Sequence, residues 1–169
     1  DEGGAERIWF VTRTEDGWSD PEFVVGGPNT VDLHWQFSVA ADGSLYVPSR
    51  GELYVSRLVN GDYLEPENLG APINSDADEA MPFIAPDGSY LLFTRFGHED
   101  NYGFADLWIS FPDKSGGWTE PLNLGERINS VAGICPIVSP DGSMLFFNGG
   151  GDNYWVDAGV IEELRAAPR

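Results

Sequence analysis

Apolar and aromatic stretches of only a few residues alternate along the whole chain with polar turns that contain Gly, Pro, Asn or Asp. The stretches have the length of strands, and the turns between them contain the residues that reverse a chain tightly. This pattern predicts an all-β protein with many short antiparallel strands. The exception is a segment near residues 158–166, for which we expect a short C-terminal helix.

The pattern is also periodic, which indicates a repeat protein. An aromatic residue followed three positions later by Pro occurs three times, at intervals of 45 and then 55 residues. An Asn and an Asp-Gly-Ser turn recur in the same order, and an apolar-aromatic strand recurs four times. The repeated positions are Trp18, Tyr63 and Trp118; Asn29, Asn74 and Asn129; the turns 42–44, 87–89 and 141–143; and the strands 8–11, 53–55, 107–109 and 153–156.

Each repeat accounts for four strands, which is the content of one blade of a β-propeller. The innermost strand precedes the Asp-Gly turn, the second follows it, the aromatic strand is third, and the outermost follows the aromatic-x-x-Pro turn. We therefore expect a partial β-propeller of four-stranded antiparallel blades, cut within a repeat at both ends. Its predicted parts are the third and outer strands of a first blade (1–28), a second blade (29–73), a third blade (74–128), an incomplete last blade (129–158) and a helix or tail (159–169).

Two details of this fold follow from the chemistry of the repeat. Because Gly takes a positive φ at no steric cost, Gly43, Gly88 and Gly142 should each have a positive φ in their hairpin turns. Blades pack face to face and no blade buries its own core. Repeated aromatic residues such as Trp108 should therefore be buried between neighbouring blades.

These motifs resemble the repeats of the TolB-type β-propeller family. The resemblance rests on the Pro-Asp-Gly-Ser turns at 86–89 and 140–143, the Asp-Leu-Trp strand at 106–108 and the Glu-Pro-x-Asn-Leu-Gly segments at 65–70 and 120–125. Residues 154–158 and 161–164 are similar to the usual end of exported proteins built from these repeats. Rings of this family have about six blades, whereas this chain contains fewer.

The resemblance implies a periplasmic or extracellular protein of the bacterial cell envelope. It also implies a non-catalytic recognition module that binds a protein or peptide at the mouth of the propeller. Because a fold does not determine a function, two alternatives stay open. One is a hydrolase, glycosidase-like or peptidase-like, with its site in the propeller channel, and the other is a purely structural part of a longer exported protein. The chain has no Gly-x-Ser-x-Gly, His-Glu-x-x-His or phosphate-loop motif, so no catalytic residue is predicted.

The chain is strongly acidic, with 28 acidic against 9 basic residues and a formal net charge of −19. Such a surface repels phosphate backbones, so we expect no nucleic-acid partner. The charge serves solubility or attracts cations or a basic partner. No apolar stretch approaches the ~20 residues of a membrane span, and Cys135, the only cysteine, cannot form an internal disulfide.

The segments that enter the innermost strands lie at one mouth of a propeller, where function in this architecture usually resides. The third repeat also contains an inserted loop, residues 95–106, which is long and polar as recognition loops often are. The predicted ligand-binding residues at this mouth are His34, Trp35, Glu79, Met81 and His98.

Three carboxylates within four residues suggest a second kind of site. Asp76, Asp78 and Glu79 offer the oxygen ligands that Ca²⁺ prefers. The segment is not an EF-hand loop, because the required Gly and distal Glu are missing, and the corresponding segments of the other repeats lack the cluster. A solvated acidic loop is the alternative, and no other cofactor is predicted.

The number of blades leads to two hypotheses about the whole ring, since a propeller needs ~4–8 blades to close. Either the chain is a fragment of a longer chain, or two copies form a homodimer that completes a six-bladed ring. In the homodimer there are two full blades and one composite blade per chain, which gives six blades in all. Both ends of the chain supply a third strand, so one of them would be surplus.

Overall fold

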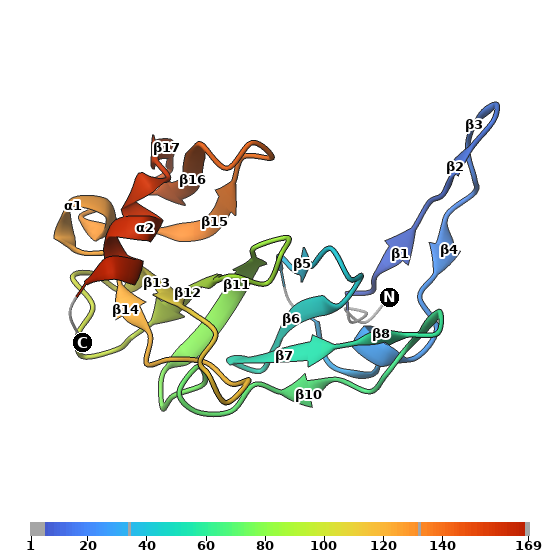
Figure 1. Cartoon of the computed structure of the whole chain (residues 1–169), viewed down its shortest axis with the longest axis horizontal. Helices are drawn as coiled ribbons and strands as arrows, with labels where there is room; N and C mark the ends of the chain where they lie inside the picture. The colour runs from blue at the N-terminus through green and yellow to red at the C-terminus, as the bar shows by residue number, and fades with distance from the viewer. Residues whose placement is uncertain (1–5, 34, 132, 168–169) are drawn as a thin grey trace.

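The protein is described by a computed structural model over residues 6–33, 35–131 and 133–167. Successive antiparallel sheets follow one another along the chain, which confirms the all-β prediction (Figure 1). The first hairpin and the last sheet lie at opposite ends of the molecule (Figure 1). The structure is a partial β-propeller of antiparallel blades with a short C-terminal helix, as predicted.

The second and third blades are complete, and in each of them the strands pair in sequence order from the innermost to the outermost. The second blade consists of β5 (Ser38–Val39), β6 (Leu45–Ser49), β7 (Glu52–Ser56) and β10 (Glu67–Asn68), with β8 (Leu58–Val59) and β9 (Asp62–Tyr63) extending its outer hairpin. The third blade consists of β11 (Asp78–Ile84), β12 (Leu91–Phe96), β13 (Ala105–Ser110) and β14 (Leu122–Asn123).

The first and last blades each contain part of this set. The first blade is one hairpin, which projects from the body of the molecule (Figure 1). It comprises β1 (Trp9–Phe10), β2 (Arg13–Thr14), β3 (Gly17–Trp18) and β4 (Glu22–Phe23), followed by the short helix η1 (Gly27–Thr30). The last blade comprises β15 (Ile134–Val138), β16 (Met144–Gly149) and β17 (Asp152–Asp157), with α1 (Glu126–Asn129) before it and α2 (Gly159–Ala166) after it. None of the helices in the described residues is long and apolar enough to cross a membrane.

The hairpin turns have the predicted geometry. Gly43, Gly88 and Gly142 have φ values of 85°, 73° and 74°. In each turn the Asp before the Gly accepts a hydrogen bond from the backbone N–H of the Ser after it. The repeated Asp-Gly-Ser sequence therefore reverses the chain between the first and second strands of each blade.

The core lies between the blades. One apolar cluster joins the second blade to the third, and it includes Leu53, Phe93 and Trp108. Trp108 is only 5% exposed, which confirms its predicted burial. A second cluster, with Leu92 and Ile109, joins the third blade to the last, and a third cluster joins the first hairpin to the second blade.

The innermost strands are less regular than the sequence pattern suggests. In the second blade the innermost strand β5 covers only Ser38–Val39, whereas β11 and β15 have seven and five residues. Trp35 has a φ of 64°, and a comparable positive φ recurs at Met81 (52°) in β11 and at Cys135 (55°) in β15. The Gln36 side chain then donates hydrogen bonds to the carbonyls of Pro82 (3.4 Å) and Pro136 (3.1 Å). One amide therefore ties together the innermost strands of three blades.

Candidate functional site

Three segments meet at the mouth where the innermost strands begin. β11 starts at Asp78, which lies opposite Phe96 at the end of β12. The tight turn Arg50-Gly51 joins β6 to β7, and the Gly51 carbonyl accepts a hydrogen bond of 2.8 Å from the Glu79 N–H. This bond fixes the turn of the second blade against the first residues of β11.

A hollow of about 510 Å³ opens between these segments. We call it the mouth hollow. Its lining combines aromatic rings, one cation and two carboxylates with small residues and backbone. The lining residues are Trp35, Pro48, Ser49, Arg50, Gly51, Asp78, Glu79, Ala80, Phe96 and Phe104.

Aromatic rings form one side of the mouth hollow. The ring centroids of Trp35 and Phe96 are 6.3 Å apart, and those of Phe96 and Phe104 are 5.8 Å apart. Trp35 is 62% exposed and Phe104 is 76% exposed. A concave, largely apolar surface with a few polar groups is the usual form of a binding site, and the exposed rings give the mouth hollow this form.

The polar groups of the mouth hollow lie beside this aromatic surface. The Arg50 guanidinium pairs with the Asp32 carboxylate, with Nη2 and Oδ2 2.6 Å apart. The Asp78 carboxylate packs directly against Gly51, where a Cβ would collide with it. Gly51 also has a φ of 80°, and this left-handed conformation favours glycine here.

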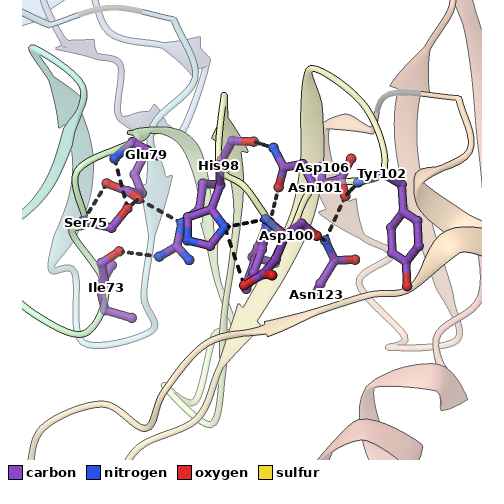
Figure 2. Close-up of polar contacts among 12 residues, drawn as sticks. Ile73, Ser75, Glu79, His98, Asp100, Asn101, Tyr102, Asp106 and Asn123 are labelled. Carbon is purple, nitrogen blue, oxygen red and sulfur yellow. Dashed lines mark hydrogen bonds and ion pairs between the residues drawn. The ribbon is translucent and has the colours of Figure 1, made fainter.

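A buried ion pair, drawn in Figure 2, joins β11 to β12 beside the mouth hollow. Glu79 Oε1 and Arg95 Nε are 2.8 Å apart, and both side chains are at most 4% exposed. Arg95 also donates to the Ile73 carbonyl and lies 4.5 Å from the centroid of the Trp108 ring. Burial lowers the pKa of Arg95, and the charge of Glu79 opposes this shift. The pair fixes the start of β11 against β12.

The inserted loop is held to the third blade by a second polar network (Figure 2). The buried Asp106 carboxylate accepts hydrogen bonds from the N–H groups of Tyr102 (2.8 Å) and Gly103 (3.2 Å). Asn101 accepts a hydrogen bond from the Trp108 indole N–H and donates one to the Arg95 carbonyl. These contacts fix the loop that carries the exposed Phe104 ring to the mouth hollow.

The residues predicted from the sequence lie at different depths around this site. Trp35, Asp78 and Glu79 line the mouth hollow, although both oxygens of Glu79 are occupied by Arg95 and Ser75. Met81 is buried behind it, 3.3 Å from the Cys135 sulfur. His98 packs its ring against Trp108, with 5.0 Å between centroids. His34 lies outside the described residues.

The Ca²⁺ site stays a prediction. Asp76 and Asp78 are exposed, whereas Glu79 is buried and paired with Arg95. In the part of the chain that the structure describes, no group of three His, Cys, Asp or Glu side chains is arranged to hold a metal ion.

Sequence reasoning missed Phe96, Phe104 and Arg50. Phe104 stands in the inserted loop, whose length was a signal, but nothing in the sequence indicates which of its residues turns toward the mouth. Phe96 is the last residue of β12 and looks like an ordinary strand residue. Arg50 occupies a two-residue turn that has the positive φ values typical of Asn-Gly rather than Arg-Gly.

Comparison with known proteins gives information about the fold and not about the function. No model of a protein family matches the sequence, and no curated protein sequence matches it either. Among solved structures, hydrazine synthase of Kuenenia stuttgartiensis matches 78% of this chain with a TM-score of 0.50 and 15% identity. A putative TolB from Agrobacterium tumefaciens matches 74% of it with a TM-score of 0.39 and 17% identity. This chain spans 42% and 58% of the lengths of those two chains.

Proposed function

We propose that this propeller is a non-catalytic recognition module that binds a protein or peptide in the mouth hollow. The observation that carries the proposal is the exposure of Trp35 and Phe104 around a concave surface. Exposed aromatic side chains are costly to leave in water and supply large contact areas in interfaces. The contacts of the inserted loop support the same proposal, because Asp106 and Asn101 tie the residues just before Phe104 to the third blade.

The family resemblance of the repeats extends this proposal to the place of action. A TolB-type repeat protein acts in the bacterial cell envelope, so we infer that the protein is exported and meets its partner there. Immunoblotting of cell fractions from the source bacterium checks this inference directly. Recovery of the protein in the cytoplasmic fraction alone would contradict it.

A display selection tests the binding proposal. A library of random peptides is selected on the immobilised chain, and the enriched peptides are measured against the double variant Trp35→Ala/Phe104→Ala. We expect at least a roughly tenfold loss of affinity, because alanine removes the aromatic contact surface. Trp18→Ala is the matched control, since Trp18 is 63% exposed on the projecting hairpin and should not affect binding. Equal affinity for the double variant and the wild type would disprove the proposal.

A further inference from the structure

We propose that the mouth hollow receives the cationic side chain of an arginine or lysine from a basic segment of the partner. This inference rests on the proposed function and names the chemistry of the ligand. Three observations lead to it: the pairing of the charges in the site, the arrangement of its aromatic rings, and the charge of the whole chain.

Of the charged side chains that line the mouth hollow, one carboxylate, that of Asp78, forms no ion pair with another described residue. Arg50 is paired with Asp32, and Glu79 is paired with the buried Arg95. Asp78 also lines the hollow and is exposed, and no cation within the described ranges 6–33, 35–131 and 133–167 forms an ion pair with it. The site therefore has a net negative charge that an incoming cation would neutralise.

The aromatic rings complete a binding site for a cation. Asp78 and Phe96 are directly opposite each other on β11 and β12, so the free carboxylate and the ring lie at the same edge of one sheet. Trp35 and Phe104 each lie beside the Phe96 ring and enlarge the aromatic surface. Cations bind to the faces of such rings, and the attraction grows when water is excluded. An arginine or lysine can pack its chain on the rings and direct its charge to Asp78.

The charge of the whole chain favours the same ligand. With a formal net charge of −19, the surface attracts basic segments and repels acidic ones. Oppositely charged partners associate faster, and salt weakens the attraction. A neutral apolar peptide would gain nothing from this field, whereas a basic segment is concentrated at the surface before it reaches the mouth hollow.

A pair of peptides that differ only in charge tests the inference. The probes are the acetylated and amidated peptide Gly-Gly-Arg-Leu-Gly-Gly and its citrulline counterpart, which keeps the size and shape of arginine without the charge. Binding to the whole chain is followed by NMR, through the amide of Gly51 and the indole of Trp35. We expect the arginine peptide to bind roughly tenfold more tightly than the citrulline peptide.

Two variants, each lacking one negative charge, test whether the preference for the arginine peptide arises at the mouth hollow. Asp78→Asn should abolish the preference for arginine. Asp16→Asn, in the exposed turn of the projecting hairpin, should leave it unchanged although it alters the net charge equally. An equal loss in both variants would show a general field effect and overturn the inference. Equal binding of the two peptides, lost in Trp35→Ala, would overturn it and leave the proposed function standing. If neither peptide binds, the inference is also overturned. The proposed function is then tested separately by the display selection.

Discussion

At the scale of single residues, short polar side chains decide where the chain turns. In the turn of the last blade, the Asp141 carboxylate accepts hydrogen bonds from the hydroxyls of Ser139 and Ser143 and from the Ser143 N–H. These hydrogen bonds lower the pKa of Asp141 from 3.8 to about 2, because they favour the charged form. The turn is therefore stabilised by an ionised carboxylate, and its stability depends on pH.

The direction of this dependence follows from the lowered pKa. Since the pKa in the folded state is below that in the unfolded state, the stabilisation is present above pH 3.8 and is lost as the pH falls toward about 2. We expect the stability of Asp141→Asn to fall less than that of the wild type across this window. Urea unfolding at several pH values measures the difference, and an NMR titration gives the pKa of Asp141 directly. A carboxyl titrating at its ordinary value would contradict the interpretation.

At the scale of elements, one asparagine per repeat joins the blades. The side-chain amides of Asn29, Asn74 and Asn129 each bond to both the N–H and the carbonyl of one residue in or next to a third strand. The partners are Ile8 just before β1, Leu53 in β7 and Leu107 in β13. For Asn129 these distances are 2.8 and 3.1 Å to Leu107. The amide therefore continues the ladder beyond the end of the outermost strand and fixes the segment that leads to the next blade.

Replacing Asn129 by Ala removes both bonds to Leu107 and the bond that Asn129 donates to the Asn123 side chain. Because Asn129 is 1% exposed, water does not replace them easily, and we expect a loss of about 1–3 kcal/mol in the free energy of unfolding. Urea denaturation monitored by tryptophan fluorescence gives this value. The control is Asn153→Ala, an exposed position on β17, for which the change should stay within about 0.5 kcal/mol. Equal effects at the two positions would show that the repeated asparagine has no special role.

The repeat also shows which parts of the structure the sequence could predict. The blades, their hairpin turns and the burial of Trp108 could be predicted from repeated sequence positions, because equivalent positions adopt the same local geometry in each blade. The mouth hollow does not recur. Phe104 belongs to a loop present in one blade only, and the Glu79–Arg95 pair joins two strands of that blade. Their positions depend on side-chain packing, which spacing alone does not reveal.

At the scale of the whole molecule, one blade face at the end of the array has no neighbouring blade among the residues that the structure describes. In the third blade, the row formed by Leu92 and Ile109 is fully buried by the last blade. The corresponding row of the last blade is exposed: Ile137 by 49%, Phe146 by 44% and Trp155 by 64%. At the other end, Trp9 is 57% exposed in the first hairpin. Both ends therefore present apolar surfaces of the kind that meet between blades.

The two hypotheses for the ring differ in what these surfaces contact. A homodimer that closes a ring predicts a discrete species of twice 18.5 kDa in light scattering. Trp155→Asp should dissociate it, because the substitution places a charge in the contact between blades. If the chain is instead part of a longer protein, another blade covers these faces, and the isolated chain should not form a discrete dimer. A monomer at every concentration would disprove the two-chain ring.

Because each blade packs only against its neighbours, the free energy of local unfolding should differ from blade to blade. The strands β12 and β13 are buried almost throughout, whereas β1, β2 and β4 are exposed. In such an array, free energies of opening fall from the middle toward the ends. Amide hydrogens of β12 and β13 should therefore exchange most slowly and those of the projecting hairpin fastest. The mouth hollow spans this gradient: Phe96 belongs to the slow-exchanging third blade, while Trp35 precedes the two-residue strand β5. Its shape should therefore change mainly through motion on the Trp35 side.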